Sequence, residues 1–242
     1  MSVANSQTLK ASQNAPQNIP KHRLGDEWLV GLASGTLSEG EAMFARTCLS
    51  FVPEAANDLA LAQTLGGAAL ERAPQAALKA DARASLLAAL DGAEMEPATS
   101  SPAPSPAPRK ERQQGGVMPA VLQDYAGGDV DRMKWSYLGP GMKKVRLWQN
   151  DKGQTLWMLR AQPGVKIPEH THEGTELTLV LKGSFHDAFG HYGPGDVEET
   201  DNSHTHDLVI DEGGECICLA LTDRPLKFKG WIARAMQPFI GL

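Results

Sequence analysis

The first hundred residues carry apolar side chains at the three- and four-residue spacing of amphipathic helices. Leu24 and Leu32 belong to a run with this spacing, which stops at Gly35, a residue typical of helix C-termini. Ser38 precedes Glu41 by three residues, which is the spacing of a reciprocal capping box. The pattern therefore predicts one helix that ends near Gly35 and a second that begins after Ser38.

Two further helices are expected before the pattern changes. Pro53 can open a third helix, which Gly66 and Gly67 would end. Residues 74–90 are rich in Ala and Leu and predict a fourth helix. We therefore expect residues 21–96 to form a small bundle of about four helices, with little aromatic mass and a thin core.

The pattern becomes strand-like in the second half of the chain. From Met133 onward, short apolar runs are separated by turns rich in Gly, Pro and Asp, which is typical of an antiparallel barrel or sandwich. The intervening segment 97–116 begins with Pro at nearly every second position and predicts an extended linker. The expected fold is thus of the α plus all-β class, with a disordered lead-in at 1–20 and a β domain at 117–242.

Composition and charge exclude several classes of protein. The chain has 242 residues and a formal net charge of -6, which disfavours a protein that chiefly binds nucleic-acid phosphates. Its three cysteines are too few for the disulfide framework of a small secreted protein. Neither a signal peptide nor an apolar run long enough to span a bilayer is present. These features predict a cytoplasmic protein.

The candidate chemistry lies in a cluster of histidines in the β domain. Six of the seven histidines fall between His170 and His206. His170, His172 and Glu176 have the same strand parity, so they would face one side of a sheet if the turn between them preserves the alternation. His204 and His206 form a second pair of equal parity. Such a set is rarely accidental, and we interpret it as a metal site.

Four other residues are weaker candidates. His186 has suitable parity but no partner motif, and His191 lies beside a Gly-rich turn, so we expect surface or packing roles for both. Cys216 and Cys218 would share one strand face, either as a thiol pair or metal site or, as we favour, as buried core residues.

The histidine motif resembles that of a known family. The run G-x5-H-x-H-x3-E-x6-G resembles the first motif of the cupins, and GHYGPGD with the histidines after it resembles the second. This resemblance implies a β-barrel of the double-stranded β-helix type that binds a divalent metal in its interior. The ligands it implies are His170, His172, Glu176 and His206, with His204 as the alternate for the fourth.

The ligand types leave the identity of the metal open. Three histidines and one glutamate can complete a tetrahedral zinc site, which would have no open position for a substrate. Iron or manganese accepts more ligands and would leave positions open for oxygen chemistry. We expect zinc first, with iron and manganese as alternatives.

The helical part has a resemblance of its own. LASGTL and, after a helix, TCLSFVPEA resemble the zinc-containing anti-sigma domain. In that alignment Cys48 stands where the family has a histidine, and His22 lies near the place of an upstream histidine. Val52 and Ala55 replace the two family cysteines. The resemblance therefore does not predict zinc here, and His22 and Cys48 remain weak candidates for a metal or redox role.

The order of the two parts resembles the anti-sigma factor ChrR family. This resemblance implies a cytoplasmic repressor that binds an extracytoplasmic-function sigma factor and releases it when the cupin domain responds to oxidative stress. It implies no direct contact with nucleic acid or membrane. The apolar residues that we interpret either as sigma contacts or as core of the bundle are Trp28, Leu32, Met43, Phe44 and Phe51.

An enzyme is the alternative. A cupin dioxygenase or isomerase would use iron or manganese at the same ligands, and its helical part would serve dimerisation. The sequence outside the metal ligands offers no recognisable substrate-binding or acid-base residues for it, so we favour the regulator.

Overall fold

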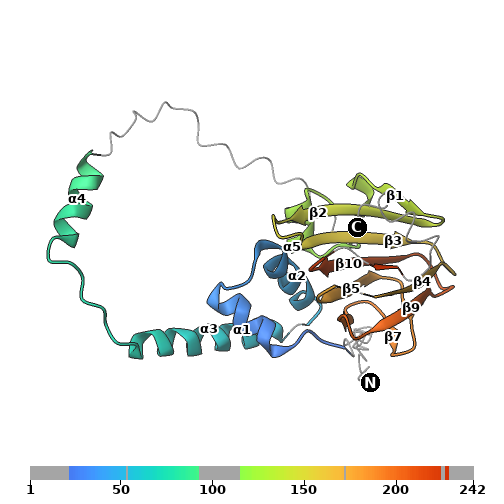
Figure 1. Cartoon of the computed structure of the whole chain (residues 1–242), viewed down its shortest axis with the longest axis horizontal. Coiled ribbons are helices and arrows are strands. Elements are labelled where there is room, and N and C mark those ends of the chain that lie inside the picture. The colour runs from blue at the N-terminus through green and yellow to red at the C-terminus, as the bar shows by residue number, and fades with distance from the viewer. Residues whose placement is uncertain (1–21, 53, 93–114, 172, 225–226, 229–242) are drawn as a thin grey trace, which may run out of the picture.

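The structure is a computed structural model that describes residues 22–52, 54–92, 115–171, 173–224 and 227–228 (Figure 1). Helices occupy the N-terminal part of the chain and two antiparallel sheets the C-terminal part, so the predicted fold class is confirmed. The helices are α1 (Asp26–Ser34), α2 (Glu39–Leu49), α3 (Ala55–Arg72), α4 (Ala82–Gly92), α5 (Ala120–Ala126) and the short 3-10 turn Val130–Arg132.

The first helix ends and the second begins where the sequence predicts. Gly35 follows α1 with φ of 69°, a left-handed conformation that glycine adopts without strain. The Ser38 hydroxyl accepts the backbone N–H of Glu41, and the Glu41 carboxylate accepts the backbone N–H of Ser38. This reciprocal capping box opens α2.

The third helix is longer than predicted. Gly66 and Gly67 do not end α3, which continues to Arg72. The Ala and Leu residues on both sides have high helix propensity and offset the glycine penalty, which is about 1 kcal/mol per residue. The helix instead ends at Ala73, which is extended because it precedes proline.

The fourth helix differs from expectation in both place and packing. It begins at Ala82 rather than near Pro74. Figure 1 shows α4 well apart from the other helices and from the sheets. The helices that pack together are α1, α2 and α3, and the predicted bundle of about four is therefore a group of three.

The β part consists of two facing sheets. The first has the strand order β1-β2-β3-β10-β5-β8 and the second β11-β4-β9-β6-β7. The strands are β1 (Ser136–Gly139), β2 (Met142–Gln149), β3 (Thr155–Ala161), β4 (Lys166–Thr171), β5 (Glu176–Lys182), β6 (Phe185–His186), β7 (His191–Tyr192), β8 (Val197–Thr200), β9 (Thr205–Ile210), β10 (Cys216–Thr222) and β11 (Lys227–Phe228).

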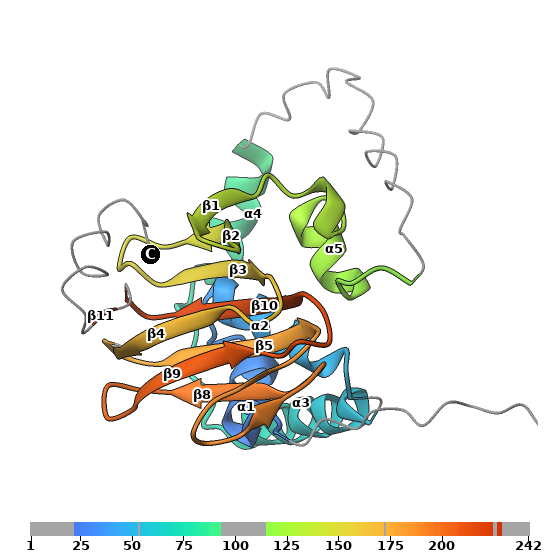
Figure 2. The same cartoon turned by 90° about the vertical axis from the view of Figure 1, so that its right-hand side faces the viewer.

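The core has two layers, one on each face of the first sheet. Alternate residues of β3, β5 and β10 point between the sheets, where they pack with Phe185, Tyr192 and Ile210. The other alternate residues point outward and are covered by α2 and α5. Figure 2 shows α1 and α2 behind the strands, on the side away from β4 and β9.

The helical and β parts share the outer core layer. Met43, Phe44 and Cys48 of α2 are buried in the same cluster as Leu156 and Leu219 of the sheet. The helical part therefore sits directly on the barrel, whatever course the predicted linker takes. The lead-in and almost all of the linker lie outside the described residues.

Candidate metal centre

One end of the space between the sheets is lined by polar residues. On the inner face of the first sheet, Glu176 of β5 lies between two cross-strand neighbours, Thr222 of β10 and Thr200 of β8. The next row joins Thr178 to Glu198. All of these except Thr178 are at most 9% exposed. The polar side chains are thus enclosed by the fold, where they need partners.

His170 and His206 face this polar end from the second sheet. They lie directly opposite each other on β4 and β9, and their ring centroids are 4.6 Å apart. Their exposed fractions are 2% and 4%. Two buried histidines side by side on neighbouring strands can supply two ligands to a metal.

The surroundings of the two rings determine which nitrogen can bind a metal. The Nδ1 of His170 lies 3.0 Å from the carbonyl oxygen of Pro168, which can only accept a hydrogen bond. The Nδ1 of His206 lies 3.1 Å from Oδ2 of Asp187. Each Nδ1 is therefore placed as a hydrogen-bond donor, which leaves Nε2 as the atom that would bind a metal in the neutral ring.

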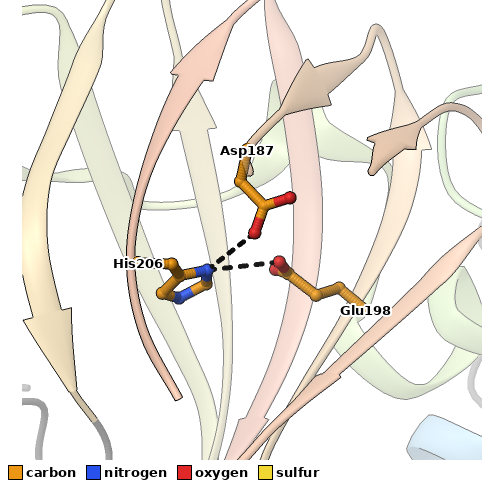
Figure 3. Close-up of side chains that lie close together, drawn as sticks. All are labelled: Asp187, Glu198 and His206. Carbon is orange, nitrogen blue, oxygen red and sulfur yellow. Dashed lines mark hydrogen bonds and ion pairs between the residues drawn. The ribbon is translucent and has the colours of Figure 1, made fainter. Parts of the chain in front are cut away.

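Two carboxyl groups converge on His206 (Figure 3). Glu198 Oε1 lies 3.3 Å from the same Nδ1 that Asp187 contacts. Asp187 follows β6, and its Oδ1 accepts the backbone N–H groups of Phe189 and Gly190, which fix the carboxylate. The ligand atoms of Asp187, Glu198 and His206 all lie within 4.8 Å of one another. Asp187 and Glu198 orient the imidazole of His206, and the three residues together are a set that can hold a cation.

Burial and charge act in opposite directions on these groups. Burial lowers the pKa of His206, but the hydrogen bonds and charges of Glu198 and Asp187 outweigh it and raise the pKa to about 9. Burial raises the pKa of Glu198 despite His206. The pKa of Asp187 is lowered, because hydrogen bonds from His206 and from backbone N–H groups outweigh its burial. Asp187 is therefore the anionic partner of the imidazole.

Glu176 reaches the same region by a route that the sequence does not predict. The turn after β4 carries the chain from the second sheet to the first, with Gly174 at φ of 98°. His170 and Glu176 thus lie on opposite sheets, and the expectation that one sheet face would hold them is wrong. Their side chains approach from two sides of the barrel interior. Oε1 of Glu176 accepts the Thr178 hydroxyl at 3.2 Å.

The other predicted ligands have different surroundings. His172 lies outside the described residues. His204 precedes β9, and its side chain is 40% exposed and contacts Asp201 at 2.8 Å. Because His204 stands in the turn, strand parity does not direct it inward, and the geometry favours His206 as the inward-facing member of the pair.

His186 and His191 form a separate group at the surface. The two are cross-strand partners on β6 and β7, and each contacts one oxygen of Asp211 at 2.7 Å. Ser184 donates its hydroxyl to the same carboxylate. Burial raises the pKa of Asp211, but the hydrogen bonds from Ser184 and both histidines outweigh it and lower the pKa to about 2. This arrangement fits the structural role expected for the two histidines.

Sequence reasoning missed Asp187 and Glu198. Asp187 stands in a short loop, where no periodicity indicates a direction. Glu198 offered a signal, because it alternates with Val197, which packs outward in the core layer shared with the helices. A glutamate at an inward parity of a strand is unusual and indicates a buried polar site.

The N-terminal candidates are placed apart from this centre. His22 is exposed, and its ring lies 4.9 Å from that of Tyr192. Cys48 is buried on α2, and burial raises the pKa of its thiol well above the usual range. A protonated, buried thiol is a poor ligand and nucleophile. Cys216 and Cys218 are buried between the sheets with their sulfur atoms 3.6 Å apart.

The five apolar residues proposed for partner contact divide into two groups. Met43 and Phe44 are buried in the core between α2 and the sheet, so a partner would have to displace the helix to reach them. Trp28, Leu32 and Phe51 are partly buried. Most of the exposed leucines lie on the later helices, where their exposed fractions are 49–85%: Leu61, Leu65 and Leu70 on α3, Leu78 before α4, and Leu86, Leu87 and Leu90 on α4.

Comparisons with known proteins agree with this architecture. Residues 123–224 match the model of the ChrR cupin-like domain. The chain is 35% identical over 221 residues to the anti-sigma-E factor ChrR of Cereibacter sphaeroides, covering 90% of this chain and 97% of that protein. It is 32% identical to ChrR in a crystal structure of Rhodobacter sphaeroides SigE in complex with anti-sigma ChrR, with a TM-score of 0.62, covering 84% of this chain and 98% of that chain.

Within the described part of the chain, no helix is both long and apolar enough to cross a membrane. The cupin fold, the buried donor set and the full-length similarity together show that this chain belongs to the ChrR family of anti-sigma factors.

Proposed function

We propose that this chain holds a sigma factor of the extracytoplasmic-function class in an inactive complex. The observation that carries this proposal is the set of exposed leucines on two helices. Leu61 and Leu65 of α3, and Leu86 and Leu90 of α4, are spaced i, i+4, so each pair lies on one helix face. Each of the four is at least 59% exposed. We call these four residues the leucine surface.

An exposed apolar surface of this kind indicates a protein partner. Each helix presents its own exposed pair of leucines, and exposed apolar side chains that lie together on one face mark interaction sites. The Cereibacter relative is named for its action on a sigma-E factor, and the similar crystal structure contains SigE. A net charge of -6 also suits a partner that carries a basic DNA-binding surface. We expect the complex to form in the cytoplasm, where sigma factors act.

Co-purification of the full chain with its sigma factor tests the interaction. We expect a complex of equal stoichiometry with the wild-type chain and its loss when Leu65→Ser and Leu90→Ser are combined. Tyr137→Ser is the matched control, because Tyr137 is also apolar and 69% exposed but lies on β1. Equal recovery of sigma factor by the leucine variant would refute this use of the leucine surface.

We further propose that His170, His172, Glu176 and His206 bind a divalent metal, zinc in preference to iron or manganese. Support comes from two buried imidazoles that are cross-strand partners with ring centroids 4.6 Å apart, and from the buried carboxylate of Glu176 on the facing sheet. A bound metal would supply a cross-link between the two sheets. The carboxylates at Nδ1 of His206 would orient that ring and raise its basicity as a ligand.

The proposed role of this metal is to report oxidative stress. Loss or oxidation of a ligand would remove the cross-link between the sheets on which the helical part rests. Metal content measured on the purified chain tests the site: we expect about one zinc per chain, and its loss in His170→Ala and in His206→Ala. His191→Ala is the control, because His191 binds Asp211 at the surface. In the same two variants sigma binding should already be weakened before hydroperoxide is added, and hydroperoxide should release no further sigma factor.

The enzyme alternative receives less support. The two relatives described above, which match 90% and 84% of this chain, are anti-sigma factors, and the proposed site offers metal ligands without a recognisable acid-base pair for a substrate. Oxygen consumption by the iron-loaded protein at a rate above that of free iron would support the enzyme alternative.

A further inference from the structure

We propose that the edge strand β8 links the metal centre to the anchor of the helical part. One residue of this strand contacts His206 inside the barrel, and its neighbours hold the chain segment that leads into α1. This inference rests on the proposed metal site and identifies how the state of that site is transmitted.

The outer side of the link is a set of contacts to His22. The backbone N–H of Val197 donates to the carbonyl oxygen of His22 at 3.0 Å. The backbone N–H of His22 donates to Oδ1 of Asp196 at 3.0 Å. The imidazole of His22 packs on Tyr192. These contacts hold the chain four residues before α1 begins at Asp26.

The inner side of the link is Glu198. This residue follows Val197 directly, and strand alternation turns its side chain into the barrel. There its Oε1 lies 3.3 Å from Nδ1 of His206, and the side chain is 5% exposed. Residues 196–198 therefore hold the helical part with one side and the candidate metal ligand with the other.

The position of β8 at the edge of the sheet allows this strand to shift when its side-chain contacts change. It is four residues long, it ends the strand order of the first sheet, and its ladder partner is β5. A short edge strand has few backbone hydrogen bonds, so side-chain contacts contribute much of its stability. A cavity of about 80 Å³ between Val197, Leu24 and Cys48 leaves room for a small displacement.

The proposed transmission has two steps. A metal bound at Nε2 would fix the ring of His206, whose Nδ1 contacts Asp187 at 3.1 Å and Oε1 of Glu198 at 3.3 Å. Loss of the metal or of the ring would free or remove these contacts and leave the buried carboxyl of Glu198 without its cationic neighbour. A movement of β8 that exposes the carboxyl of Glu198 would weaken the hydrogen bonds of Val197 and Asp196 to His22. The start of α1, which follows His22, would then be held less firmly.

Thermodynamic linkage makes the coupling measurable from both ends. If metal binding stabilises the anchor by a given factor, an intact anchor must raise the metal affinity by the same factor. A variant of the anchor that leaves every metal ligand in place should therefore weaken metal binding. His22→Pro is such a variant, because proline lacks the N–H that Asp196 accepts.

Hydrogen exchange of the full-length chain, with and without zinc, tests the link. We expect zinc to slow exchange of the amides in 22–34 by about fivefold or more in the wild type, which is the lower range of allosteric coupling. In His22→Pro, zinc should slow exchange in 22–34 by less than about twofold. The zinc affinity of this variant should be lower than that of the wild type by the same factor as the slowing that is lost. Asp196→Asn, which keeps the side-chain shape, should act in the same direction.

A second pair of variants tests the inner contact without relying on zinc. Glu198→Gln should speed exchange in 22–34, whereas Glu199→Gln should not, because Glu199 is an exposed neighbour on the same strand. The link would be overturned if zinc binds tightly but exchange in 22–34 is the same with and without it. Equal exchange in Glu198→Gln and Glu199→Gln would overturn it too. Neither result would contradict the proposed metal site. Absence of zinc binding would instead refute the metal proposal, and the two glutamine variants would still decide the link.

Discussion

Gly40 of α2 lies directly against the indole of Trp148 on β2. A Cβ placed at Gly40 would stand 2.5 Å from Cε3 of Trp148, closer than side-chain atoms normally approach. The absence of a side chain at Gly40 thus allows the first turn of α2 to rest on the sheet. This contact joins the helical part to the barrel and fixes the distance between them.

The close approach predicts opposite effects for two Gly→Ala substitutions. Gly40→Ala should lower the free energy of unfolding by about 1–3 kcal/mol, since the added methyl group must displace Trp148 or the helix. Gly66→Ala should raise it by about 0.5–1 kcal/mol, because Gly66 lies in α3 with nothing near its Cβ position. Urea denaturation measures both. A Gly40→Ala variant as stable as Gly66→Ala would contradict the close contact.

Asp187 and Asp201 distinguish the two histidines proposed for the fourth ligand. Asp187→Asn should lower zinc affinity about 10- to 100-fold, because Asp187 orients His206 through Nδ1. Asp201→Asn, which alters the partner of His204, should leave the affinity unchanged. Competition with a chromophoric chelator measures both values. The reverse ranking would assign the ligand to His204.

The surface group around Asp211 predicts a pH dependence of stability. The pKa of Asp211 is lowered to about 2 in the folded chain, below the value of about 3.9 in an unfolded one. The carboxylate therefore stabilises the fold above pH of about 4, and this contribution is lost as the pH falls toward 2.

Asp211→Asn isolates that contribution. The variant should be less stable than the wild type by roughly 1 kcal/mol at pH 6, since the group is partly exposed, and the difference should shrink between about pH 4 and 2. Thermal unfolding across this range provides the measurement. If the stability difference between the wild type and Asp211→Asn does not change with pH, the charge of Asp211 does not contribute to stability.

The leucine surface predicts a specific effect on solution behaviour. Replacing Leu61, Leu65, Leu86 and Leu90 with serine should lower the unfolding midpoint by no more than about 4 °C, because exposed side chains contribute little to packing and only the lower helix propensity of serine is felt. The variant should also aggregate less in the absence of the partner, since apolar area is removed from the surface. Light scattering and thermal unfolding on the same sample check both. A large loss of stability would show that these leucines pack within the protein.

Local chemistry made much of the fold predictable from the sequence. Ser38 and Glu41 satisfy each other's backbone groups, and Gly35 adopts a conformation that other residues avoid, so both helix ends follow from short-range rules. Gly66 and Gly67 misled because glycine inside a helix costs little when its neighbours are strong helix formers.

The site was less predictable because it depends on contacts between distant segments. His170 and His206 could be recognised from their motif, but Asp187 and Glu198 approach His206 from a loop and from another sheet. The crossing at Gly174 also separates His170 from Glu176, which strand parity alone cannot show. Likewise, the seating of α2 on the sheet depends on Gly40 and Trp148, which are distant in sequence.

Inhibition of transcription by the purified chain tests the central claim most directly. A reaction that contains core RNA polymerase, the sigma factor and its promoter is titrated with the full-length, zinc-loaded protein. We predict that transcript falls to background near one chain per sigma factor, and that the variant with serine at the four leucine-surface positions does not inhibit. Undiminished transcription at a several-fold excess of the wild-type chain would contradict the account.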